Sequence, residues 1–126
     1  METKKRILIV DDEAFIRVLL FQTLEELSDQ GVEVLTATNG EEAMELALRY
    51  RPQLIFLDVM MPRLGGLEVC RRLKSREDYT PYIIFLTAKG QPVDRQSASA
   101  VGGDEYITKP FDPEYILARA EAVLGL

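Results

Sequence analysis

Five short apolar segments recur along this chain, and two of them, Ile7–Val10 and Leu54–Leu57, are apolar at every position. A strand with one face in water alternates apolar and polar residues, whereas a strand covered on both faces is apolar throughout. The unbroken runs therefore predict a parallel sheet with helices on both sides. The other segments predicted as strands are Val34–Thr36, Ile83–Thr87 and Tyr106–Thr108.

Segments with helical periodicity separate these strands, because their apolar residues recur at intervals of three and four. Two of them carry start signals: Asn39 is an N-cap with Glu42 three residues later, and Asp112 is a cap before Pro113. The apolar stripes of the five predicted helices lie, in order, within Ile16–Leu27, Ala43–Tyr50, Leu67–Leu73, about Pro92 to Val101, and Ile116–Leu124.

This alternation predicts a doubly wound α/β domain with five parallel strands and five helices. Ligands in such sheets bind outside the carboxyl ends of the strands, near the point where the strand order reverses. The chain has 126 residues and no tract that resembles an interdomain linker. We therefore predict a single domain that spans residues 1–126.

Composition excludes several classes of protein. A net charge of −6, without a dense cluster of lysine and arginine, argues against a nucleic-acid surface. A single cysteine, Cys70, rules out an internal disulfide and favours a reducing, cytoplasmic location. No apolar run is long enough to be a signal peptide or a membrane span. The absence of histidine excludes histidine metal sites and serine–histidine catalysis.

Three acidic residues follow two of the predicted strands. Asp11 and Asp12 come directly after Ile7–Val10, and Asp58 follows Leu54–Leu57. If these strands are neighbours, their carboxylates converge, and such crowding is costly unless a cation lies among them. Oxygen ligands of this kind suit Mg²⁺. Each acid also has a simpler interpretation, with Asp11 or Asp12 as a helix cap and Asp58 as a turn residue.

Two further polar residues, Thr87 and Lys109, fall at the ends of the fourth and fifth predicted strands. Taken alone, Thr87 is an ordinary strand residue and Lys109 a solvated surface lysine. Their position at the same edge as the three acids makes them candidates for the same site.

Four motifs together resemble the receiver domain of bacterial response regulators. They are Asp11-Asp12, the segment from Leu57 to Pro62, Leu86-Thr87-Ala88, and the segment from Tyr106 to Phe111. The resemblance spans the whole chain and implies a flavodoxin-like sheet with strand order 2-1-3-4-5.

The resemblance also implies a role for each site residue. Asp58 is the phosphoryl acceptor, and Lys109 and Thr87 contact the phosphoryl oxygens. Asp12 binds Mg²⁺ directly, Asp11 mainly through water, and Asp58 and the backbone carbonyl of Met60 complete the metal site. The Lys109–Pro110 peptide is cis. Thr87 and Tyr106 form the switch that couples phosphorylation to the surface of the fourth helix, fifth strand and fifth helix.

The implied partners are a histidine kinase or a histidine phosphotransfer protein, and a downstream protein target. Phe15 and Val18 lie off the core face of the first helix, either as a docking patch for the phosphodonor or packed under neighbouring loops. The domain is not an enzyme beyond promoting its own phosphorylation and dephosphorylation. The chain ends after the fifth helix, which favours a stand-alone receiver over a fragment of a longer regulator.

Some positions depart from the common family pattern. Gly103 stands where alanine is usual, and Leu64-Gly65-Gly66 replaces a frequent Met-Asp-Gly. Met60 and Lys89 occupy positions that tune dephosphorylation, and an apolar Met60 predicts a long-lived phosphoryl group.

Two rival classes share parts of the pattern: a Mg²⁺-dependent phosphatase with an aspartate nucleophile, and an FMN carrier. The first expects an Asp-x-Asp motif, and the second a phosphate loop where this chain has Asp11-Asp12-Glu13.

Overall fold

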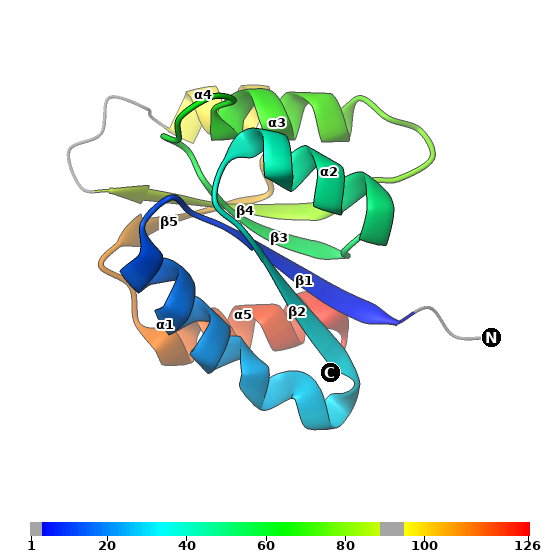
Figure 1. Cartoon of the computed structure of the whole chain (residues 1–126), viewed down its shortest axis with the longest axis vertical. Coiled ribbons are helices and arrows are strands. Elements are labelled where there is room, and N and C mark those ends of the chain that lie inside the picture. The colour runs from blue at the N-terminus through cyan, green and yellow to red at the C-terminus, as the bar shows by residue number, and fades with distance from the viewer. Residues whose placement is uncertain (1–3, 89–94) are drawn as a thin grey trace.

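A computed structural model describes residues 4–88 and 95–126 as a parallel sheet with helices on both faces (Figure 1). The sheet order is β2-β1-β3-β4-β5, and every neighbouring pair is parallel. This confirms the predicted strand order. The strands are β1 (Lys5–Val10), β2 (Val32–Ala37), β3 (Leu54–Asp58), β4 (Tyr82–Ala88) and β5 (Glu105–Lys109).

Helices α1 and α5 cover one face of the sheet, and α2, α3 and α4 cover the other (Figure 1). Their bounds are α1 (Ala14–Leu24), α2 (Gly40–Tyr50), α3 (Gly66–Lys74), α4 (Arg95–Ala100) and α5 (Pro113–Leu124). The first helix is shorter than its apolar stripe predicted, because a 3₁₀ helix, η1 (Glu25–Gln30), continues it and buries Leu27. Lys89 and the predicted start of the fourth helix at Pro92 lie outside the described residues.

Two apolar clusters, one on each face of the sheet, hold the layers together. Leu8, Val10, Ile55 and Leu57 point toward α2, α3 and α4, whereas Ile7, Ile9 and Phe56 belong to the cluster shared with α1 and α5. All five residues of β3 are buried, because β3 lies between β1 and β4 and is covered on both faces. The unbroken apolar runs in the sequence reflect this double burial.

The predicted caps of α2 and α5 are present. The Asn39 side chain accepts a hydrogen bond from the Glu42 amide at 2.9 Å, and Asp112 accepts one from the Glu114 amide at 2.9 Å. The Glu42 carboxylate accepts from the amide of Thr38 at 2.6 Å instead of from Asn39, so the reciprocal bond is displaced by one residue. Each cap satisfies an amide that the helix itself leaves unpaired.

Gly103, the departure from the family's usual alanine, has a packing reason. An added Cβ there would lie 2.5 Å from the ring of Phe85, which is fully buried on β4. The amide of Gly103 also donates to the carbonyl of Ala98 on α4 at 3.0 Å. The ring of Phe85 thus occupies the space that a side chain at position 103 would need.

Within the described residues, no helix combines the length and apolar character that a bilayer-spanning segment requires.

Candidate functional site

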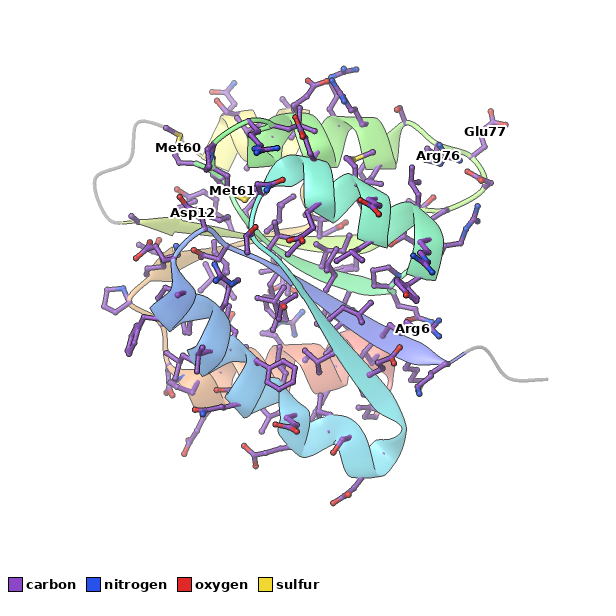
Figure 2. The ribbon with its side chains drawn as sticks, in the orientation of Figure 1. Arg6, Asp12, Met60, Met61, Arg76 and Glu77 are labelled. Carbon is purple, nitrogen blue, oxygen red and sulfur yellow. The ribbon has the colours of Figure 1, made fainter. Side chains whose placement is uncertain are left out.

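The polar residues that the sequence places at strand ends meet at the carboxyl edge of the sheet. β1 and β3 are neighbours with Val10 opposite Leu57, so the residues that follow, Asp11 and Asp58, are side by side. Asp58 is opposite Leu86, and Ala88 is opposite Lys109, which adds the end of β4 and of β5 to the same edge. In Figure 2, Asp12, Met60 and Met61 gather at this end of the sheet, away from Arg6, Arg76 and Glu77 at the other end.

Burial sets this edge apart from the rest of the molecule. Only four polar or charged residues among those described are buried, and all four lie here: Asp11, Asp58, Thr87 and Lys109. Charged side chains are rarely buried unless they are paired or have a function. Asp12, by contrast, is exposed beside them.

Lys109 is the cation among the acids. Its Nζ lies 2.8 Å from Asp11 Oδ2, 3.3 Å from Glu13 Oε1 and 3.8 Å from Asp58 Oδ2. The Lys109–Pro110 peptide is cis, as the resemblance implies. One ammonium therefore faces three carboxylates, and the cluster as a whole carries excess negative charge.

The pKa values reflect this crowding. Burial, aided by the negative charge of Asp11, raises the pKa of Asp58 to about 7, although Lys109 opposes the rise. Burial also raises the pKa of Asp11, although the Lys109 ammonium beside it opposes the rise. Burial alone would lower the pKa of Lys109, but the neighbouring carboxylates, above all Asp11, outweigh it and raise the pKa. Asp58 is thus a carboxylate whose ionised form lacks sufficient counter-charge.

The acidic residues fit a divalent metal ion. Carboxylate oxygens of Asp11, Asp12 and Glu13 all lie within 4.8 Å of one another. This set differs from the predicted trio, because Glu13 belongs to it and Asp58 does not. Hard oxygen donors near an excess of negative charge are what Mg²⁺ requires. Sequence reasoning did not assign to the site Glu13, which directly follows the acidic pair and whose Oε1 lies 3.3 Å from the Lys109 ammonium.

The helix-cap interpretation of Asp11 and Asp12 does not hold. The N-cap residue of α1 is Glu13, and no side chain caps this helix. Asp11 Oδ1 instead accepts a hydrogen bond from the amide of Glu13 at 2.9 Å. Asp11 therefore stabilises the turn that presents the acids rather than the helix.

Thr87 has an unused hydroxyl. The residue is 1% exposed, and its Oγ1 has no hydrogen-bond partner among the described residues. A buried hydroxyl without a partner is unfavourable by about 1–3 kcal/mol. Such a group fits a site that gains acceptor oxygens when a ligand or a covalent modification arrives.

The loop after Asp58 approaches the acceptor closely. The amide of Met60 donates to Asp58 Oδ1 at 3.3 Å, and the amide of Gly66 donates to the carbonyl of Val59 at 2.9 Å. An added Cβ on Gly66 would lie 2.1 Å from the carbonyl oxygen of Asp58. The first residue of α3 therefore packs against the backbone of the acidic residue without room for a side chain.

Four other residues named in the sequence analysis lie outside this cluster. Tyr106, on β5, is partly buried and packs against the apolar cluster beneath α4. Phe15 and Val18 are 76% and 55% exposed on α1, so the interpretation that they pack under neighbouring loops is wrong. Cys70 is buried, as predicted for the third helix.

A five-stranded parallel sheet of this order, with acids and a lysine at its carboxyl edge, defines the fold class of signalling receiver domains. The chain belongs to the response regulator receiver domain family, whose family model matches residues 7–121. This membership leaves the phosphatase and FMN-carrier alternatives without support.

Relatives and solved structures agree with this family. The chain is 45% identical over 120 residues to the alkaline phosphatase synthesis transcriptional regulatory protein PhoP of Bacillus subtilis, covering 95% of this chain and 48% of that protein. It is 46% identical over 121 residues to the probable transcriptional regulator ycf27 of Porphyra purpurea, covering 96% of this chain and 48% of that protein. The chain thus spans about half the length of these relatives.

Two structures share the whole fold. The chemotaxis response regulator CheY4 of Vibrio cholerae matches with a TM-score of 0.81 and 35% identity, over 96% of this chain and 99% of that one. The receiver domain of AraT, a response regulator from Geobacillus stearothermophilus, matches with a TM-score of 0.83 and 31% identity, over 95% and 92% of the two chains. The chain is therefore a receiver domain of the two-component kind, and such domains are signalling domains.

Proposed function

We propose that this domain accepts a phosphoryl group on Asp58 in a Mg²⁺-dependent reaction. The observation that carries the proposal is that all four buried polar or charged residues of the described chain, Asp58 among them, lie at one edge of the sheet. Burial of these polar and charged groups lowers the stability of the fold. Their concentration at one edge therefore indicates a functional site. Residues 1–126 form one receiver domain in this proposal.

The transfer is a displacement at phosphorus. A carboxylate oxygen of Asp58 forms a bond to phosphorus while the bond to the donor's leaving atom breaks, and the product is an aspartyl phosphate. Bound Mg²⁺ supplies the positive charge that offsets repulsion between the carboxylate and the phosphoryl oxygens. Asp11 and Asp12 hold the metal, with Asp58 and the backbone carbonyl of Met60 as further ligands.

Lys109 and Thr87 receive the new phosphoryl oxygens. The Lys109 ammonium is already 3.8 Å from Asp58 and needs only a small movement to contact them. The unpartnered hydroxyl of Thr87 donates to an oxygen that is absent before the reaction. The domain promotes only its own phosphorylation and dephosphorylation, and slow hydrolysis beside the apolar Met60 stays a prediction.

The proposed switch depends on the space that Thr87 vacates beside β4. When Thr87 moves toward the phosphoryl group, space opens beside β4, and Tyr106 on β5 turns toward it. The phosphoryl group shifts the population because its contacts differ between the two states. The surface of α4, β5 and α5 then binds a downstream protein, whether the domain stands alone or belongs to a longer regulator. A cytoplasmic location is also part of the proposal, supported by the single unpaired Cys70.

Mass spectrometry after incubation with acetyl phosphate and Mg²⁺ tests the phosphoryl site. We expect one added phosphoryl unit on the parent chain, lost when EDTA replaces Mg²⁺, and none on Asp58→Asn. As a control, Asp78→Asn removes an exposed carboxylate at the other end of the sheet and should be labelled like the parent chain. Labelling of Asp58→Asn to the parent level would refute the assignment.

The phosphodonor is proposed to be a histidine kinase or a histidine phosphotransfer protein that docks on Phe15 and Val18. Both side chains are apolar and exposed on the helix that begins next to the acidic turn. We expect the double variant Phe15→Ala, Val18→Ala to accept phosphate from a phosphohistidine donor about tenfold more slowly, because a buried apolar contact is lost. Labelling by acetyl phosphate should be unchanged.

The matched control for docking is Leu126→Ala, which shortens an exposed apolar residue at the chain's end. It should leave both reactions unchanged. If the double variant slowed both donors equally, the patch would act on the site itself, and the docking proposal would fail.

A further inference from the structure

The turn that presents the metal-binding acids is held by an arginine that belongs to neither the predicted site nor the ion-pair cluster. Arg17, in the first full turn of α1, donates from Nη1 to the backbone carbonyl of Asp11 at 2.8 Å. Its own amide donates to the carbonyl of Glu13 at 3.1 Å. Arg17 therefore contacts both ends of the turn formed by Asp11, Asp12 and Glu13.

The carbonyl of Asp11 needs such a partner. Asp11 is fully buried, and β1 ends one residue earlier, at Val10, so the pairing with β3 stops before it. The amide of Asp11 still bonds to Ala37 at 3.2 Å, but the carbonyl is left for another donor. Buried carbonyls are almost always paired, and a charged donor gives a stronger bond than a neutral one.

The direction of the guanidinium is informative. Three carboxylates lie on or beside this turn, yet within residues 4–88 and 95–126 the recorded ion-pair partner of Asp11 and Glu13 is Lys109. Arg17 contacts the backbone of Asp11 instead. The guanidinium thus does not compete with Lys109 or with a metal ion for the carboxylates, while it fixes the backbone behind them.

We infer that Arg17 is a positioning residue for the metal site and sets the affinity for Mg²⁺ through the carbonyl of Asp11. The inference rests on the proposed function. Residues that orient metal ligands from behind typically change metal affinity by about 10–100-fold when they are substituted. Without the bond to Arg17, the turn gains freedom, and the carboxylates of Asp11 and Asp12 no longer share one direction.

The sign of the effect separates positioning from simple electrostatics. Arg17 is a positive charge near the metal site, so its removal would strengthen Mg²⁺ binding if only charge mattered. Loss of the positioning bond weakens binding instead. Arg17→Lys keeps the charge, so charge alone predicts no change, whereas the shorter and non-planar donor predicts weaker binding.

The experiment measures the dissociation constant for Mg²⁺ by calorimetry, at fixed ionic strength, for the parent chain and three variants. We expect Arg17→Met to bind about tenfold more weakly, and Arg17→Lys to fall between it and the parent. Arg49→Met is the control, since it removes an exposed arginine from α2 at the other end of the sheet. It should bind Mg²⁺ within about twofold of the parent, as the remote charge is screened.

Amide exchange supplies a readout that does not involve the metal. The amide of Glu13 is bonded to Asp11 Oδ1 at 2.9 Å, and it should exchange faster in Arg17→Met without Mg²⁺. Exchange in the core strand β3 should be unchanged, which shows that the effect is local. If Arg17→Met does not fold, Arg17→Lys decides the question.

Unchanged or tighter Mg²⁺ binding in both Arg17 variants would overturn the inference. That result is distinct from failure of the proposed function, in which the parent chain itself would neither bind Mg²⁺ nor be labelled on Asp58.

Discussion

The substitution Gly66→Ala is expected to lower the free energy of unfolding by about 3 kcal/mol. The added Cβ would lie 2.1 Å from the Asp58 carbonyl oxygen and 3.0 Å from the Cα of Val59. Both neighbours are backbone atoms, so no flexible side chain can move aside. Alanine is a better helix former than glycine by about 1 kcal/mol, but that gain is smaller than the cost of the forced backbone shift.

Gly65 provides the matched control. A Cβ there would have its nearest neighbour, the carbonyl oxygen of Val59, at an ordinary 3.7 Å, and the backbone φ of −71° suits any residue. Gly65 is the N-cap residue of α3, where alanine is poorer than glycine, so Gly65→Ala should cost no more than about 1 kcal/mol. Urea denaturation followed by far-ultraviolet circular dichroism measures both. Equal stabilities for the two variants would show that the loop after Asp58 yields easily, contrary to the packing described.

Asp58→Asn is expected to stabilise the metal-free domain at pH 8. Burial and the charge of Asp11 raise the pKa of Asp58 from 3.8 to about 7. At about 1.4 kcal/mol per unit, the ionised carboxylate costs at most about 4 kcal/mol. The amide that replaces it must also be buried, so we expect a net gain of about 2 kcal/mol.

The pH dependence fixes the sign of this effect. Between about pH 4 and pH 7 the folded chain holds a proton on Asp58 that the unfolded chain has lost. Stability of the parent chain therefore falls as the pH rises through this window. The advantage of Asp58→Asn should be absent near pH 4 and complete at pH 8, as measured by urea denaturation in EDTA.

Asp78 serves as the control of opposite sign. Hydrogen bonds from Arg76 and Arg51 lower the pKa of this exposed carboxyl to about 2. Its stabilising contribution is present above the unfolded pKa and is lost as the pH falls through the folded one. Asp78→Asn should therefore slightly destabilise the domain at neutral pH, and salt should reduce the effect. A parent chain whose stability stays constant from pH 4 to pH 8 would contradict the destabilisation assigned to the ionised carboxylate of Asp58.

The sequence predicted the architecture well because its strongest signals are periodic. The apolar runs Ile7–Val10 and Leu54–Leu57 indicate strands covered on both faces, and both are buried throughout. Asp11 and Asp58 follow these runs directly, so their meeting at one edge follows from neighbouring parallel strands. The strand order itself came from the family resemblance, since periodicity does not specify which strands pair.

What the sequence did not predict depends on contacts between distant segments or on details of the backbone. Glu13 joins the acidic cluster because the chain bends at Asp12 and the Glu13 amide donates to Asp11 Oδ1, and Arg17 contacts that turn from α1. At Gly66 the backbone of Asp58 leaves no room for a Cβ atom, and at Gly103 the ring of Phe85 leaves none. None of these contacts has a periodic signature, so a one-dimensional pattern does not reveal them.

Among the described residues, Asp11, Asp58, Thr87 and Lys109 are buried together at one edge of the sheet, and this has a consequence for engineering. A redesign that selected for thermal resistance alone would replace these residues with aliphatic ones, because the surrounding described core is apolar. The result would be a sturdier scaffold unable to receive a signal. Resistance to heat and responsiveness therefore compete at this one location, and elsewhere in the interior they can be improved independently.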